Sequence, residues 1–337
     1  MKVKKPAIGV TFGDAAGIGP EIIAMVARKG YLHRYARPVL IGDERVLKRG
    51  MRDTGSLFEY EVVEDIEAAL ACERLPLLDT RGIDGMAIEL GTVTAENGKE
   101  EGDNLVRCIE YCQSGHLDGF CFTPLNKSAL KAGGYNYPSE HEMFADIYGI
   151  RSHFGEMNVL KNLWNIRVTS HIPLSEVSSR ITIEKILDSV ELGYSTLLRA
   201  GKNDPRIAVA ALNPHSGENG TCGREEIDII KPAIAEAAKM GIILDGPFSS
   251  DILFLKAFNG GYDGVVTMYH DQGQIAIKLK GFMHCVTVSA GLPHAITTPA
   301  HGTAYDIVGS GECSTASFED AYRICCRMAA HDRSVRA

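Results

Sequence analysis

Short apolar segments alternate with amphipathic segments along most of this chain, and this alternation restricts its fold more than any other feature. The apolar segments include AIGVTF at residues 7–12, PVLIGD at 38–43 and YDGVVTMY at 262–269, and a last helical pattern occupies 317–330. Strands that alternate with helices form βαβ units around a largely parallel sheet. We therefore predict an α/β fold.

Chain length and the lack of a linker set the expected domain organisation. A chain of 337 residues suits two α/β domains better than one core. No proline-, glycine- or serine-rich linker interrupts the alternation, so the boundaries fall inside it. We expect a discontinuous first domain of residues 1–127 and 262–337, and a second domain of residues 128–261.

Composition and charge exclude several classes of partner. The formal net charge of −8 argues against nucleic acid or an anionic membrane as the main partner. No run of 18 apolar residues occurs, and the N-terminus lacks the long apolar core of a signal peptide, so we expect a cytoplasmic protein. The nine cysteines include no C-x-x-C pair, and we expect reduced thiols.

Polar motifs follow the apolar segments repeatedly, at the points where the predicted strands end. GDAAGIGPE follows AIGVTF, TPLNK follows GFCF, TSHIP follows NIRV, NPHSGENG follows RIAVAAL, and HDQGQ follows GVVTMY. Ligands bind outside the carboxyl ends of the strands in open α/β sheets. We therefore expect a ligand-binding cleft lined by these loops.

Three of these loops supply a histidine after the strand: His171, His215 and His270. Neutral imidazole is a common ligand of Zn, Co, Ni and Fe, and three imidazoles leave coordination positions for substrate and water. The equivalent positions after three strands favour a metal site. The alternative is that each histidine hydrogen-bonds its own loop, since separations of 44 and 55 residues match no local metal motif.

Two glycine-rich segments are candidate ligand loops. Glycines at 13, 17 and 19 lack the spacing of the dinucleotide fingerprint, so a tight turn explains GDAAGIG as well as a ligand loop does. PAHGTAYDIVGSG at residues 299–311 has small side chains that allow close backbone approach, and Asp306 offers a carboxylate to ribose hydroxyl groups. The alternative for this second segment is a polar turn before the last helix.

Two lysines and one helix start complete the candidates. Lys127 in TPLNK is a candidate proton donor or anion contact, or a solvated residue at the start of a helix. Lys278 alternates with apolar residues in QIAIKLKGF, which favours a strand with the lysine in the cleft; an ordinary surface lysine is the alternative. Ser139 and Glu142 have capping-box spacing, which predicts that a helix begins there.

Together these motifs make the chain resemble the 4-hydroxythreonine-4-phosphate dehydrogenase family over nearly its whole length. The resemblance rests on GDAAGIGPE, TPLNK, TSHIPL, LNPHSGE with GREEID, GPFSSDILF, MYHDQG and HGTAYD, which occur in the family's order. It implies a two-domain α/β/α sandwich similar to isocitrate and isopropylmalate dehydrogenases, with the active site in the interdomain cleft of a homodimer. It also implies that the discontinuous domain carries the nucleotide-binding loop and that the second domain makes dimer and substrate contacts.

The resemblance implies a reaction as well: oxidation of a small, phosphorylated hydroxy acid by NAD, followed by decarboxylation. His171, His215 and His270 match the family's metal ligands, which both subunits contribute. Zinc is the expected divalent metal, with Mg, Mn, Co and Ni as alternatives. Lys127 and Asp251, the latter in GPFSSDILF, are the candidate catalytic residues.

The segment HGTAYDIVG resembles the adenosine-binding loop of the wider dehydrogenase fold. In that fold, NAD users have an acidic residue followed by an aliphatic one where NADP users have Lys-Tyr. A carboxylate accepts hydrogen bonds from ribose and repels a 2′-phosphate, so NAD is the expected cofactor. The expected cofactor contacts are Gly302, Thr303, Ala304, Asp306 and Ile307.

Several substrate positions depart from the biosynthetic pattern of this family. The expected substrate contacts are Glu140, His141, Lys278, Thr287 and Ile296, and only the lysine is retained. Isoleucine in place of arginine removes a bidentate anion contact, and Glu140 adds repulsion toward anions. Alternative substrates are threonate or erythronate 4-phosphate and carboxylated cis-dihydrodiols. A phosphate acyltransferase-like enzyme and a non-catalytic metabolite-binding protein are remoter alternatives, because neither needs three histidines.

Overall fold

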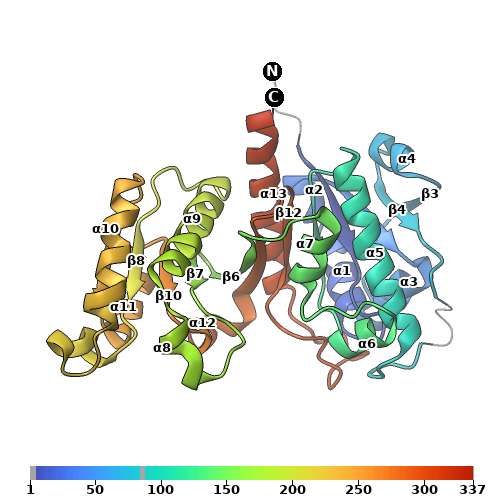
Figure 1. The fold of residues 1–337 in the computed structure, drawn as a ribbon. Coiled ribbons are helices and arrows are strands. Elements are labelled where there is room, and N and C mark those ends of the chain that lie inside the picture. The colour runs from blue at the N-terminus through green and yellow to red at the C-terminus, as the bar shows by residue number, and fades with distance from the viewer. Residues whose placement is uncertain (1–4, 84–87, 337) are drawn as a thin grey trace. The chain divides into compact units, whose positions relative to one another are not determined.

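The computed structural model describes residues 5–83 and 88–336 of the chain. The chain divides into two compact units, of which the first comprises Met1–Arg151 and Val286–Ala337 and the second Ser152–Cys285 (Figure 1). Strands and helices alternate in both units, and the predicted α/β fold is confirmed. Within the described residues, no helix is both long enough and apolar enough to cross a membrane.

The sheet of the first unit has the strand order β3-β4-β2-β1-β5-β12-β11. Its strands pair in parallel except that β11 runs antiparallel to β12. Strand β1 pairs with β2 on one side and with β5 on the other, so the strand order reverses at β1. The strands are β1 (Ala7–Thr11), β2 (Arg37–Gly42), β3 (Tyr60–Val63), β4 (Leu75–Asp79), β5 (Gly119–Phe122), β11 (Cys285–Ala290) and β12 (Ala295–Pro299).

Helices pack closely against this sheet and against one another. The last helix, α13 (red in Figure 1), packs on β12 and β5, and α1 crosses α3. A side chain at Gly50 of α3 would meet the carbonyl oxygen of Pro20 at 2.2 Å, so glycine permits this crossing. The helices are α1 (Gly19–Arg28), α2 (Leu32–Tyr35), α3 (Glu44–Thr54), α4 (Ile66–Ala71), α5 (Ala95–Gln113), α6 (Lys127–Ala132), α7 (Glu140–Tyr148) and α13 (Ala316–Arg336).

Helices α6 and α7 belong to the first unit, although the expected boundary at 127/128 separates them from it. Phe144 of α7 packs edge-on against Phe120 and Phe122 of β5, at ring distances of 5.7 and 5.8 Å. Gly98 of α5 lies directly against the carbonyl of Ala129 in α6. These apolar and backbone contacts move the division to residue 151.

The second unit contains a sheet with the order β6-β7-β10-β8-β9. Strands β7, β10, β8 and β9 pair in parallel, and β6 is antiparallel to β7. Because β10 lies between β7 and β8, the second expected boundary at 261/262 also shifts, and this unit continues to residue 285. The strands are β6 (Gly155–Leu160), β7 (Leu163–Arg167), β8 (Ile207–Ala210), β9 (Leu244–Phe248) and β10 (Gly264–Thr267).

Five α-helices of this second unit lie among the described residues, and α12 corrects one prediction. The segment around Lys278 was expected to be a strand, but it lies in α12, where the lysine is exposed. Gly273, Gln274 and Ile277 form the buried face of this helix, with spacings of one, three and four residues that suit a helix. The helices are α8 (Val177–Arg180), α9 (Ile183–Arg199), α10 (Lys231–Lys239), α11 (Ser250–Lys256) and α12 (His270–Gly281).

Candidate functional site

Three loops of the first unit meet at the carboxyl ends of β1, β5 and β12, which are neighbours in its sheet. The backbone N–H of Asp14 donates to the carbonyl of Pro124 at 3.1 Å, and that of Ile18 donates to the carbonyl of Thr303 at 3.1 Å. These contacts join GDAAGIGPE, TPLNK and the loop of residues 299–311. The loops therefore form one edge, beside the strand at which the order reverses, where α/β sheets bind ligands.

The loop of residues 299–311 is tied to the start of α1 by a buried carboxylate. Glu21 accepts hydrogen bonds from the backbone N–H groups of Gly309 at 2.8 Å and Gly311 at 3.2 Å. Arg49 lies 3.5 Å from the same carboxylate and donates to the carbonyl of Gly17 at 2.7 Å, and both charged side chains are buried. This ion pair and its hydrogen bonds hold the two motifs together.

The predicted cofactor residues lie on this anchored loop. Gly302 and Asp306 are exposed, whereas Thr303, Ala304 and Ile307 are partly buried. Ala304 has a φ of 48°, a left-handed conformation that is uncommon for residues other than glycine. No heavy atom lies within 4 Å of the position that a side chain at Gly302 would take. The loop thus presents an open glycine and an exposed carboxylate within five residues, which suits the ribose of a dinucleotide.

A buried polar cluster that the sequence did not reveal lies beneath the loop. Asp14 is fully buried, and it accepts a hydrogen bond from the phenol of Tyr305, which also accepts one from the Asn126 amide at 2.9 Å. Burial raises the pKa of Asp14, although the bond from Tyr305 opposes this change. Burial and the nearby charge of Asp14 raise the pKa of Glu101 well above its ordinary value. Burial therefore disfavours the ionisation of both carboxyl groups, and the charge of Asp14 further disfavours that of Glu101.

Lys127 and Glu140 come together in the structure. Lys127 begins α6 and is exposed, and its Nζ lies 3.6 Å from the Oε2 of Glu140 at the start of α7. Both residues border a hollow of about 10 Å³, which has room for roughly one water molecule and not for a metabolite. A candidate catalytic cation is thus held beside the carboxylate that departs from the family pattern.

The segment of residues 139–142 begins a helix as predicted. The Ser139 hydroxyl accepts a hydrogen bond from the Glu142 N–H at 3.4 Å, so Ser139 caps α7. His141 is partly buried, and its Nε2 lies 3.3 Å from the Ser139 hydroxyl. The helix start is therefore confirmed, and substrate contact by Glu140 and His141 stays a prediction.

The structure does not gather the other candidate residues of the first unit at this edge. Ile296 is fully buried in β12 and Thr287 is 8% exposed in β11, so both side chains lie in the packed interior of the sheet. In the second unit, Asp251 on α11 and Lys278 on α12 are exposed. The roles of these four residues stay predictions.

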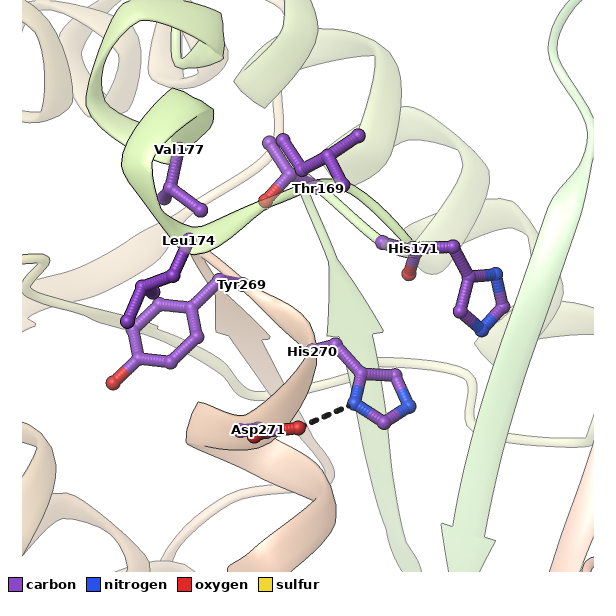
Figure 2. A pocket seen from close by; sticks show the side chains of 9 residues that line it. Thr169, His171, Leu174, Val177, Tyr269, His270 and Asp271 are labelled. Carbon is purple, nitrogen blue, oxygen red and sulfur yellow. Dashed lines mark hydrogen bonds and ion pairs between the residues drawn. The ribbon is translucent and has the colours of Figure 1, made fainter.

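The second unit contains a pocket that two of the three histidines line. The pocket has a volume of about 280 Å³ and lies at the carboxyl ends of β7 and β10. The rings of His171 and His270 lie on the same side of it, with centroids 5.5 Å apart (Figure 2). Tyr269, Leu174 and Val177 lie on the other side, so the pocket has a nitrogen-rich side and a more apolar one (Figure 2).

Asp271 orients one of these two rings. The Nδ1 of His270 donates to the Oδ1 of Asp271 at 2.7 Å when it carries the proton (Figure 2). This bond leaves the Nε2 of His270 as the ring's free lone pair, an arrangement typical of metal-binding histidines. Asp271 follows His270 directly in the sequence. A carboxylate next to a candidate metal-binding histidine is a sequence signal that could have identified Asp271 as a functional residue.

Backbone strain marks two of the histidines. His171 has a φ of 44° and His215 a φ of 51°, and Ser216, Glu218 and Asn219 share this left-handed conformation. Such residues cost free energy and cluster at functional sites. His153 has the same conformation, so the strain by itself assigns no function to either loop.

The predicted set of three histidines is not gathered within this chain. Among the residues described, no three His, Cys, Asp or Glu side chains lie close enough together to hold a metal ion. His171 and His270 offer two suitable imidazole nitrogens, and the third histidine, His215, stands on a different loop after β8. Two converging imidazoles fit a divalent metal as a partial ligand set.

Comparison with known proteins identifies the family. The family model described as pyridoxal phosphate biosynthetic protein PdxA matches residues 34–325, which is most of the chain. The chain belongs to the PdxA family.

Relatives of this PdxA family member carry dehydrogenase names. A protein from Pseudomonas aeruginosa, provisionally named 4-hydroxythreonine-4-phosphate dehydrogenase 2, is 42% identical over 97% of this chain and 98% of its own length. A provisionally named D-threonate 4-phosphate dehydrogenase from Symbiobacterium thermophilum is 36% identical over 98% of this chain and 99% of its own. The crystal structure of a 4-hydroxythreonine-4-phosphate dehydrogenase from Burkholderia phymatum has a TM-score of 0.81 and 35% identity, over 96% of this chain and 98% of that one. The resemblance predicted from the motifs is confirmed, and the chain is a member of a dehydrogenase family.

Proposed function

We propose that this protein is an NAD- and divalent-metal-dependent dehydrogenase that oxidises and decarboxylates a small, phosphorylated hydroxy acid. The observation that carries the proposal is the convergence of His171 and His270 in one pocket, with Asp271 orienting the second ring. The names of the relatives support the substrate class. The resemblance implies that both subunits of a homodimer contribute ligands, which accounts for His215 standing apart.

The residues of the chain have distinct roles in this proposal. His171, His215 and His270 would hold the metal, which would act as a Lewis acid toward the alcohol oxygen. Asp306 would accept hydrogen bonds from the adenosine ribose and repel a 2′-phosphate, so that NAD is preferred over NADP. Lys127 would move a proton, either from the substrate hydroxyl group or to the carbon that loses carbon dioxide. Asp251 is the second candidate for such a proton transfer.

The substrate that we favour is a four-carbon sugar-acid phosphate, such as threonate or erythronate 4-phosphate. Glu140 lies 3.6 Å from Lys127 and stands at a position where the chain departs from the biosynthetic pattern, which favours a substrate other than 4-hydroxythreonine 4-phosphate. Ile296 is buried and stands where the biosynthetic pattern has an arginine, which is a second departure from that pattern. The D-threonate name of one relative supports this choice. 4-Hydroxythreonine 4-phosphate and a carboxylated cis-dihydrodiol are the alternatives.

Metal binding tests the histidine assignment without reference to turnover. We expect His171→Ala and His270→Ala each to weaken Co(II) binding at least about tenfold in calorimetry, since each removes a ligand. His153→Ala is the matched control, because His153 is also an exposed, left-handed histidine of the second unit and lies 3.6 Å from Glu191. Unchanged Co(II) affinity in both site variants would contradict the assignment.

A substrate screen tests the reaction. Sugar-acid phosphates, 4-hydroxythreonine 4-phosphate and dihydrodiols would be offered with NAD and with Zn, Mg or Mn, and NADH formation would be followed by absorbance. We expect turnover that a chelator abolishes and that NAD supports better than NADP. NADH formation that resists chelation would refute the metal requirement, and faster turnover with NADP would refute the role given to Asp306.

A further inference from the structure

Tyr305 lies inside the predicted cofactor loop, yet it is the one residue of 302–307 to which no role is assigned. Its neighbours Ala304 and Asp306 are expected to contact the dinucleotide. The phenol hydroxyl of Tyr305 contacts the two other loops. It donates a hydrogen bond to the carboxylate of Asp14, which follows β1, and accepts one at 2.9 Å from the amide of Asn126, which follows β5. One hydroxyl group thus connects all three loops at the ligand-binding edge.

Both ends of the Asn126 side chain are engaged. Its Nδ2 donates to Tyr305, and its Oδ1 accepts from the backbone N–H groups of Ser128 and Ala129, each at 3.0 Å. The second pair of bonds makes Asn126 the N-cap of α6, whose first residue is Lys127. Because the amide group is planar, Asn126 cannot follow a displaced phenol without losing its bonds to the helix.

The other partners of this bridge are fixed. Asp14 is fully buried, its Oδ1 accepts from the N–H of Ala16 at 2.9 Å, and its own N–H bonds the carbonyl of Pro124. The backbone N–H of Asn126 donates to the Glu101 carboxylate at 3.3 Å. Of the three loops that this hydroxyl group connects, the one that carries Tyr305 is the one expected to contact the dinucleotide, and its residues Gly302 and Asp306 are exposed.

We propose that Tyr305 is a positioning residue that couples occupation of the dinucleotide loop to the placement of Lys127. A dinucleotide held by residues 302–307 fixes the phenol, the phenol fixes the Asn126 amide, and the amide completes the cap that sets the first turn of α6. This inference rests on the proposed function, since it requires NAD at the loop and a role for Lys127. Beyond the proposed function, it states that the hydroxyl group of Tyr305 connects the dinucleotide loop to Lys127.

Hydrogen–deuterium exchange with and without NAD tests the connection directly. In the unmodified protein we expect NAD to slow exchange in residues 302–307 and also in residues 128–132 of α6, by roughly fivefold or more. Tyr305→Phe keeps the ring and removes the hydroxyl group, so NAD should still protect the loop but no longer protect α6. The retained loop protection also shows that the variant is folded.

Tyr60→Phe is the matched control. It removes a comparable bond in the same unit, from the phenol to the Oε1 of Glu44 at 2.9 Å, on strand β3. This variant should keep the response of α6 to NAD. Protection of α6 that persists in Tyr305→Phe, or that never occurs in the unmodified protein although the loop is protected, overturns the coupling.

Kinetics separate positioning from direct cofactor contact. We expect Tyr305→Phe to lower kcat roughly tenfold, as for loss of a hydrogen bond to a charged group, with the Kd of NAD changed by less than about threefold. The opposite split, a weaker Kd with kcat unchanged, would make Tyr305 a cofactor contact and overturn the proposal. If NAD protects no part of the unmodified protein, the dinucleotide site itself is wrong and the coupling fails with it.

Discussion

Gly98→Ala offers a sharp test of how α6 is placed. Gly98 lies on α5 where it crosses α6, and an added Cβ would lie 1.7 Å from the carbonyl oxygen of Ala129 and 2.0 Å from its carbonyl carbon. Ordinary contacts begin near 3.4 Å, so the helices would have to separate by about 1.7 Å, and backbone rather than side chain would have to move.

The expected magnitude follows from two opposing effects. Overpacking of this kind costs up to about 3 kcal/mol, whereas replacing glycine by alanine inside a helix gains about 1 kcal/mol. We therefore predict a net loss of about 2 kcal/mol in the free energy of unfolding, or about 6 °C in Tm. Because Lys127 begins the displaced helix, we also predict a fall in kcat of about 10- to 100-fold.

Urea unfolding and steady-state kinetics measure the two effects. Gly155→Ala is the control, since the nearest atom to an added Cβ there is the Cδ2 of Leu192 at 3.6 Å, an ordinary contact. Wild-type unfolding and wild-type kcat in Gly98→Ala would refute the close approach of α5 and α6. A loss of stability with full activity would refute instead the link between α6 and the chemistry.

Three further changes test other parts of the first unit. Ser139→Ala should lower the unfolding free energy by about 1 kcal/mol in urea, because the N-cap of α7 is lost. Arg49→Met should cost about 3–5 kcal/mol by the same assay, since it leaves the buried Glu21 without its cation; a change below 1 kcal/mol would contradict this burial. Glu101→Gln tests the raised pKa of Glu101. A carboxyl group whose pKa is higher in the folded state than in the unfolded state stabilises the fold at a pH below its unfolded-state pKa. This contribution is lost as the pH rises through its folded-state pKa. The glutamine variant should therefore gain stability relative to wild type from about pH 5 to pH 8, and a constant difference over this range would show that Glu101 is not buried as described.

Local sequence pattern was enough to predict the α/β fold and the strands that carry the motifs. Helices and strands have different hydrophobic periodicities, and the alternation of apolar and amphipathic segments shows both of them along the chain. This pattern can be recognised without knowing which distant residues are in contact. The cap at Ser139 follows from four consecutive residues. His171 and His270 were expected to come together because they follow parallel strands, and β7 and β10 are indeed neighbours.

Contacts between distant residues could not be predicted in this way. Tyr305 bonds Asp14 across 291 residues and Asn126 across 179, and nothing in the local pattern of any of the three indicates its partners. Lys278 was wrongly assigned to a strand because apolar and polar residues alternate around it. Such an alternation over a few residues also occurs in a helix, and Lys278 lies in α12. The division of the units depended on which sheet α7 packs against, which is a matter of tertiary contact.

The first unit is assembled from both ends of the chain, and this has a consequence for its synthesis. Strands β1 to β5 leave the ribosome early, but β12 and α13, which cover the β5 edge, are among the last segments made. Until then, the nascent chain exposes an unpaired strand edge and a glutamate, Glu21, whose amide partners at Gly309 and Gly311 do not yet exist. The second unit is one continuous stretch of the chain, so it can fold before the C-terminal segment of the first unit has been made. Premature termination near residue 290 would therefore yield a chain with one folded unit and one aggregation-prone, incomplete sheet.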